Sequence, residues 1–168
     1  MEPEELDNIY EAMKPQLLRY CTYRCGDPDV AEDIVQEAML RLWQHEVQGP
    51  PESIRAWLFK TARRLIMDAD KIARNRRRLR ALNPTVDAPP ELPDEALERK
   101  EARARVRAVL CRMPERGREI LLLRYSGFEY REIATKVGVA PGSVGTLLAR
   151  AERRFLKLME LPGENEES

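Results

Sequence analysis

Arginine and lysine are the side chains whose number and spacing in this 168-residue chain suggest chemistry. The chain has 29 of them against 29 acidic residues, so the net charge is zero, but the charges are unevenly placed. Residues 60–80 hold nine bases and two acids, and residues 102–160 hold thirteen bases and six acids. An acidic stretch, 81–101, separates the two blocks. The pattern predicts two surfaces that bind a polyanion, although the bases of 102–160 alone could also belong to solvated helix faces.

The same inventory of side chains argues against an enzyme. The chain has one histidine, no glycine-rich phosphate loop, and no nucleophile paired with a base, so we expect no catalytic residues and no cofactor. Glu32, Asp33 and Glu37 could imitate a metal cluster, but they would share a helix without a histidine ligand, which favours docking or solvation. Cys21 and Cys25 stand four residues apart without further ligands, so buried thiols are favoured over a metal site or a redox switch.

The elements that must position these residues are helices. Alanine, leucine, glutamate and arginine dominate, and glycine is scarce. Apolar spacing predicts a helix from Glu4 to about Arg24, which Pro15 kinks or breaks. A second helix is predicted from about Pro28 to His45. Its N-cap would be Asp27 and its buried stripe Ala31, Ile34, Val35, Ala38, Leu42 and Trp43. A third helix is predicted to begin at Ile54 with Ser53 as its cap.

A proline-rich segment divides the chain. Pro84, Pro89, Pro90 and Pro93 cannot continue a helix, and neighbouring acids keep the segment solvated, so residues 83–94 are predicted to be an extended linker. We therefore expect an all-α fold with two small helical domains, residues 1–82 and 95–162, and a short tail, 163–168. The acidic N-terminus and the lack of an 18-residue apolar run predict a cytoplasmic protein without membrane insertion.

The sharpest local pattern is a helix-turn-helix between Tyr130 and Arg150. Two helices that cross steeply need a small residue at the crossing, which Ala134 supplies, and Gly138 tolerates the positive φ of a tight turn. Pro141 can open the second helix, whose N-terminal half would face the major groove. The small shared core would consist of Ile133, Val137, Val139, Val144 and Leu148. An unrelated helical hairpin is the alternative.

The second helix of this motif carries few groups that can read bases. Its expected groove-facing residues are Ser143, Gly145, Thr146 and Leu147, none of which is charged. Arg131 and the later bases Arg150, Arg153, Arg154 and Lys157 are expected to bind DNA, the later ones at phosphates, which positions a protein without specifying bases. Base recognition would then rest on few hydrogen bonds, on thymine methyls against Leu147, or on DNA shape.

Two separated motifs resemble bacterial sigma factors. Residues Met113–Tyr125 followed by Gly127–Ala134 resemble their region 4, and residues Asp29–Trp43 followed by Arg55–Phe59 resemble their region 2. The order and the short linker are similar to the extracytoplasmic-function (ECF) group of the sigma-70 family, over about residues 5–160. The resemblance implies a factor that binds core RNA polymerase and directs initiation at promoter DNA through the −10 and −35 elements. It also implies an anti-sigma factor as a regulatory partner, clamped between the two lobes.

The resemblance assigns roles to the residues of the first domain. Docking on the clamp-helix coiled coil of the polymerase would use Asp33, Gln36, Glu37, Leu40 and Arg41, which could otherwise be a solvated face. The −10 element would be bound by Lys60, Arg63, Arg64, Asp68, Lys71, Arg74 and Arg77, with Trp57 and Phe59 as possible aromatic contacts and Trp57 favoured as a core residue.

Three residues depart from the family pattern. Family members often have asparagine where Arg64 stands, and commonly a lysine and an arginine where Gly145 and Leu147 stand. Arginine donates hydrogen bonds but cannot accept them, so the family's promoter sequence cannot be transferred to this chain.

Two other functions would use the same motifs. A sigma-like mimic that sequesters an anti-sigma factor would not need the bases of Arg74–Arg80, and it would not displace other sigma factors from core polymerase. A stand-alone helix-turn-helix repressor would leave the first domain unexplained, and it would bind duplex DNA tightly without polymerase.

Overall fold

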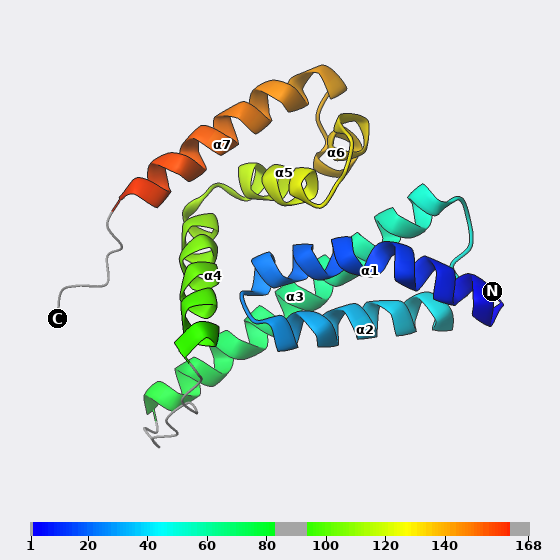
Figure 1. Ribbon diagram of the computed structural model, residues 1–168, viewed down its shortest axis with the longest axis horizontal. Helices are drawn as coiled ribbons and strands as arrows, with labels where there is room; N and C mark the ends of the chain where they lie inside the picture. The colour runs from blue at the N-terminus through cyan, green and yellow to red at the C-terminus, as the bar shows by residue number, and fades with distance from the viewer. Residues whose placement is uncertain (1, 83–93, 162–168) are drawn as a thin grey trace. The chain divides into compact units, whose positions relative to one another are not determined.

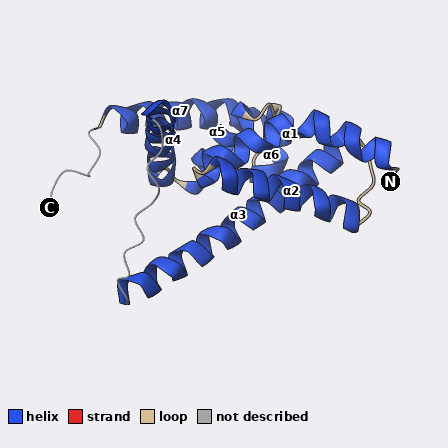
Figure 2. Ribbon diagram, turned by 60° about the horizontal axis from the view of Figure 1, so that its bottom comes forward, coloured by secondary structure: helices blue, strands red, loops and turns tan. Residues whose placement is uncertain are grey.

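The computed structural model describes residues 2–82 and 94–161, and all regular structure within these ranges is helical (Figures 1 and 2), which confirms the all-α class. The chain forms two compact units, residues 1–97 and 98–168. None of the helices in the described ranges has the length and apolarity needed to cross a membrane. The helices are α1 (Pro3–Cys25), α2 (Pro28–Gln44), α3 (Pro51–Leu82), α4 (Asp94–Arg112), α5 (Glu115–Tyr125), α6 (Tyr130–Val137), the 3-10 turn η1 (Pro141–Ser143) and α7 (Val144–Glu160).

The first unit is a bundle in which α1, α2 and α3 each contact the other two (Figure 1). Its centre is filled by fully buried side chains from all three helices, among them Leu17, Tyr20, Leu42 and Leu58. Tyr20 and Phe59 meet edge to face with 5.2 Å between ring centroids, an arrangement that contributes about 1 kcal/mol beyond its buried area. This core is the rigid base from which the outward faces of α2 and α3 are presented.

The junction between α1 and α2 follows from three consecutive residues. Gly26 adopts φ 75°, and its N–H donates to the Thr22 carbonyl over 2.8 Å, which ends α1. Asp27 then caps α2, because its Oδ1 accepts from the N–H of Asp29 over 2.9 Å. Pro28 occupies the first helical position, where its fixed φ favours the helix and no donor is lost. The predicted end of the first helix near Arg24, the start of the second near Pro28 and the cap at Asp27 are confirmed.

Replacing Asp27 by alanine should lower the free energy of unfolding by about 1 kcal/mol, because the first turn of α2 loses its side-chain acceptor. Urea denaturation followed by circular dichroism measures the change. The matched control is Asp27→Asn, which keeps a side-chain oxygen and should retain most of the stability. An Asp27→Asn variant as unstable as Asp27→Ala would show that the cap is not the cause.

Three local predictions about these helices were wrong. Of the kink or break predicted at Pro15, the break does not occur: helix α1 continues through Pro15, since Leu17, Tyr20 and Cys21 bury the following turns against the bundle and outweigh one lost hydrogen bond. Helix α3 begins at Pro51, which suits a first helical position, so Ser53 lies inside the helix and is no cap. Trp43 is 56% exposed rather than buried; it lies about 100° around the helix from buried Leu42.

Helix α3 extends beyond the bundle that it helps to form. Among the residues of α3 whose burial the structure describes, Ile66 is the last that is buried, and residues 67–82 continue for about 24 Å past it. Figure 2 shows this half of α3 running on past α1 and α2. Most of the arginines of residues 60–80 lie on this extension, beyond the buried core of the bundle.

The second unit is built on α5, α6 and α7, with α5 contacting both of the others. Ile120, Leu123, Phe128, Ile133 and Val144 are almost completely buried in its core. The guanidinium of Arg105 on α4 donates to the Met159 carbonyl over 2.8 Å in the last turn of α7, where carbonyls have no partner within the helix. The predicted tail, and the predicted linker except Asp94, lie outside the described residues.

Candidate functional site

The turn between α6 and α7 has the geometry of a helix-turn-helix. Gly138 adopts φ 72° and ψ 42°, and its N–H donates to the Ala134 carbonyl over 2.9 Å. Ala134 is buried at the helix crossing, as its small size predicted. Pro141 opens the 3-10 turn η1, which leads directly into α7. Val144 and Leu148 are buried as predicted, while Val137 and Val139 are only half-buried.

The predicted DNA-binding residues of this unit fall into exposed and partly covered positions. Gly145 and Leu147 border the buried face of α7 on its two sides and are half-buried. The side of α7 opposite its buried face is polar and exposed. The exposed residues of the predicted set are Arg131 on α6, Ser143 in η1, and Thr146, Arg150, Arg153 and Arg154 on α7. The surface is therefore basic along α7, but its first turn offers only hydroxyl groups.

The bases of α3 form a stripe along one side of the helix. Lys60, Arg64, Lys71 and Arg74 are exposed, and their spacing of about whole helical turns places them on one face. Asp68 and Arg77 are exposed on the two flanks of this stripe, and Arg63 is half-buried beside it. The structure therefore aligns four of the seven predicted residues, which we call the α3 stripe, and leaves the other three beside it.

The two aromatic residues at the start of α3 differ in accessibility. Phe59 is buried against Tyr20 and cannot reach a nucleic acid without opening the core. Trp57 is half-buried, and its ring lies 6.2 Å from that of His45, centroid to centroid. Of the two, only Trp57 keeps part of its ring accessible for stacking.

The five predicted docking residues lie together on the outward face of α2. Asp33 and Gln36 are exposed, and Leu40 is 46% exposed despite its apolar side chain. The guanidinium Nε of Arg41 donates to Glu37 Oε1 over 2.7 Å, one helical turn away. An apolar side chain is thus surrounded by charged and amide groups, which is the composition of a protein-binding surface with an apolar centre and a polar rim. We call these five residues the α2 surface.

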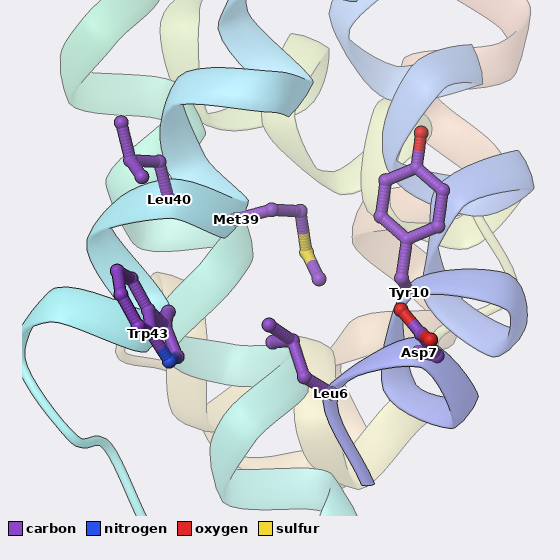
Figure 3. Close-up of a pocket in the computed structure, with 6 residues that line it drawn as sticks. All are labelled: Leu6, Asp7, Tyr10, Met39, Leu40 and Trp43. Carbon is purple, nitrogen blue, oxygen red and sulfur yellow. The ribbon is translucent and has the colours of Figure 1, made fainter. Parts of the chain in front are cut away.

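A hollow of about 280 Å³ adjoins the α2 surface between α1 and α2. Its lining is mostly apolar, from Leu6, Asp7, Tyr10, Met39, Leu40 and Trp43. In Figure 3 Leu6 and Met39 point into the space between the two helices, and Leu40 and Trp43 lie on the α2 side. The hollow extends the apolar centre of the α2 surface beyond Leu40.

The sequence prediction missed Trp43 as a surface residue. The sequence pattern predicts Trp43 in the buried stripe of α2, but Trp43 follows Leu40 by three residues, so the two side chains share the outward face of the helix. That spacing was the available signal. Leu6 and Tyr10, four residues apart on α1, give the hollow its other wall.

The cysteines lie apart from these surfaces. Cys21 and Cys25 are buried, and the Cys25 thiol donates to the Cys21 carbonyl over 2.8 Å. Burial raises the pKa of the Cys21 thiol, so little reactive thiolate forms near neutral pH. Within the described ranges, no group of three or more histidine, cysteine or acidic side chains is placed to hold a metal ion.

Thiol labelling should therefore find one fast-reacting cysteine in the native chain at neutral pH. Cys111 is exposed and should react first, while Cys21 and Cys25 should react only after denaturation. The rate of labelling is measured with an aromatic disulfide reagent that releases a coloured thiolate, and Cys111→Ser is the control. Fast labelling of Cys111→Ser would show that the pair on α1 is accessible after all.

Comparisons with known proteins agree with both units. The family described as Sigma-70 region 2 matches residues 9–78, and the family described as Sigma-70, region 4 matches residues 103–155. ECF RNA polymerase sigma factor SigL of Mycobacterium tuberculosis is 34% identical over 157 residues, which cover 91% of this chain and 88% of SigL. ECF RNA polymerase sigma factor SigM of Bacillus subtilis is 25% identical over 167 residues, covering 96% of this chain and 99% of SigM.

Two solved structures share the fold. CnrH, solved in complex with the cytosolic domain of CnrY, has a TM-score of 0.67 at 17% identity and covers 95% of this chain and 90% of CnrH. The sigma factor RpoE of Bartonella quintana, solved with the anti-sigma factor NepR, has a TM-score of 0.60 at 22% identity, and the match covers 94% of this chain and 98% of RpoE. The two matched regions and the similarity to SigL along nearly the whole chain show that this protein belongs to the ECF group of sigma-70 factors, non-enzymatic proteins that bind core RNA polymerase and direct initiation at promoters.

Proposed function

We propose that this sigma factor docks on core polymerase through the α2 surface and the adjoining hollow. The observation that carries the proposal is the exposure of Leu40 and Trp43 within a rim of Asp33, Gln36 and Glu37. Burying an aromatic anchor and an aliphatic side chain inside a polar rim is how most interfaces concentrate their binding energy. A coiled coil such as the polymerase clamp helices offers the matching partner, a ridge of apolar side chains flanked by charges.

The α3 stripe is proposed to carry the −10 element. Lys60, Arg64, Lys71 and Arg74 give a track of cations along one helix face, which suits the phosphates of a separated strand. Trp57, half-buried at the start of the same helix, is the aromatic side chain placed to stack on a base. The cationic side chains of α3 would therefore bind a melted DNA strand mainly through the phosphates of that strand.

The helix-turn-helix is proposed to hold the −35 element as a duplex. The arginines of α7 lie beyond its first turn, where they would bind phosphates and fix the register of the helix in the groove. Hydroxyl groups of Ser143 and Thr146 are the polar groups nearest the groove, and either can pair with several bases. The helix-turn-helix would then be held firmly on the phosphates of the −35 DNA, while α7 itself would distinguish few bases.

We also propose control by an anti-sigma factor in the cytoplasm, where core polymerase acts. The support is that RpoE was solved with an anti-sigma factor and CnrH with the cytosolic domain of CnrY. An anti-sigma factor that covers the α2 surface would compete directly with core polymerase. Binding of the two partners should then be mutually exclusive.

Site-specific photocrosslinking tests these assignments together. A photoreactive amino acid is placed at Trp43, Lys71 or Thr146, one position at a time, in the full chain bound to core polymerase and a promoter. We expect crosslinks from position 43 to a polymerase subunit, from 71 to −10 DNA and from 146 to −35 DNA, with Tyr23 as a control position. Crosslinks from position 43 to DNA, or from 71 to protein alone, would contradict the assignment.

A further inference from the structure

The first turn of α7 has a gap in its DNA-facing surface at Gly145. Gly145 borders the exposed face of the helix, and Ala149, one turn later on the same side, adds only a methyl group. A residue on α6 lies against this gap. A Cβ atom built on Gly145 would stand 3.6 Å from Cε2 of Tyr130, an ordinary contact distance. The tyrosine ring thus lies beside the place where a side chain at this position of α7 would begin.

Tyr130 is held firmly at this place. It is the first residue of α6, directly after the capping box in which the Glu129 N–H donates to Glu132 Oε2 over 2.8 Å. The guanidinium of Arg124 lies over the tyrosine ring, 5.3 Å from its centroid, within the range of a cation–π contact. Arg124 is in turn held by a 3.3 Å hydrogen bond from Nη1 to the Phe128 carbonyl.

Tyr130 nevertheless keeps 42% of its surface exposed. A tyrosine so placed offers a hydroxyl, which can donate or accept, and an apolar ring edge that can contact a thymine methyl. The N-terminal end of the first helix of such a motif lies beside the DNA backbone next to the recognition helix. The ring is therefore within the zone that DNA occupies when α7 enters the groove.

We propose that Tyr130 is a specificity-determining residue for the −35 element, with Arg124 as the positioning residue that orients its ring. The proposal rests on the proposed binding of −35 DNA by the helix-turn-helix. Because Gly145 has no side chain, the group that contacts DNA at this border of α7 comes from α6. The base preference of this factor is set in part by a residue outside its recognition helix.

The test uses core polymerase with the full chain and a promoter that this holoenzyme itself selects from genomic fragments. The −35 region of that promoter is randomised, and the transcribed templates are sequenced for the wild type, Tyr130→Ala and Tyr130→Phe. Tyr125→Ala, an exposed tyrosine of the same unit, is the matched control. Thermal melting by circular dichroism confirms that each variant is folded.

We expect Tyr130→Ala to reduce discrimination at one or two −35 positions by about ten-fold, as for the loss of one base contact. Tyr130→Phe, which keeps the ring and loses the hydroxyl, should give a smaller change at the same positions, and it decides the matter if Tyr130→Ala is unfolded. The Tyr125→Ala variant should keep the wild-type preference at every −35 position. Gly145→Lys should shift the preference at the same positions, because the lysine stem would lie against the ring and add a charged donor at this border of α7.

A uniform fall in transcription by both Tyr130 variants, with unchanged base preference, would overturn the proposal. Tyr130 would then contact only the phosphate backbone of the DNA. A wild-type holoenzyme that starts at specific sites without any −35 preference would overturn the proposed role of the helix-turn-helix itself. The two failures are therefore separate results of one experiment.

Discussion

The Leu40→Asp variant should bind core polymerase about 30- to 100-fold more weakly than the wild type. Leu40 lies at the centre of the α2 surface, and truncating or charging a central anchor typically costs about 2–3 kcal/mol of binding free energy. A charge in place of Leu40 would also be desolvated without a partner when the interface closes. Fluorescence anisotropy of the labelled full chain, titrated with core polymerase, measures the dissociation constant.

Leu79→Asp is the matched control for this variant. Leu79 is an exposed leucine of the same unit, but it lies on the extension of α3, away from the α2 surface. Its replacement should leave the affinity for core polymerase within about two-fold, as surface substitutions outside an interface do. Equal losses in the two variants would mean that a general charge effect, and not the α2 surface, determines binding.

Removing three cations of the α3 stripe should slow promoter opening by about 100-fold, since each lost charge-assisted contact costs about 1 kcal/mol or more. The variant combines Arg64→Gln, Lys71→Gln and Arg74→Gln, all exposed on one face of α3. Affinity for core polymerase should not change, because the α2 surface is intact. Potassium permanganate footprinting of the melted strand, in holoenzyme saturated with each variant, measures the rate of opening.

Salt dependence distinguishes lost phosphate contacts from a distorted helix. If the three side chains bind the phosphates of a single strand, the triple variant should change the salt dependence of promoter binding. The slope of log affinity of the holoenzyme for the promoter against log salt concentration should become about 2 less steep, at about 0.7 per contact. Arg99→Gln, Lys100→Gln and Arg112→Gln, which remove the same charge from exposed positions of α4 outside the predicted DNA-binding residues, are the control. A triple variant of the α3 stripe with normal opening, or one matched by the control, would contradict the proposed track.

The sequence predicted the elements well where a local signal marks them. Gly26, Asp27 and Pro28 place a helix stop, a cap and a restart next to one another, and the structure has all three. Ala134 and Gly138 likewise mark the helix-turn-helix through properties of their own, a small side chain and a permitted positive φ. Such features depend on neighbouring residues alone and can be found without tertiary information.

Predictions failed where packing or distant residues decide. Pro15 remains helical because the residues after it are buried by other helices. Trp43 was predicted to be buried from its type, but exposure depends on which neighbour covers that side of α2, and none of the described residues does so fully. Tyr130 and Gly145 are fifteen residues apart in the sequence, and only the three-dimensional path of the turn places the tyrosine ring beside the Cβ position of Gly145.

This chain alone should give core polymerase its promoter specificity, through one DNA contact in each domain. Mapping RNA 5′ ends after transcription of fragmented genomic DNA by core polymerase, with and without the chain, tests it most directly. We predict a set of start sites that depends on the chain, each preceded by two shared motifs at a fixed spacing, the −10 and −35 elements. Start sites that are unchanged by the chain, or that share no upstream motif, would show that the chain does not determine promoter specificity in this way.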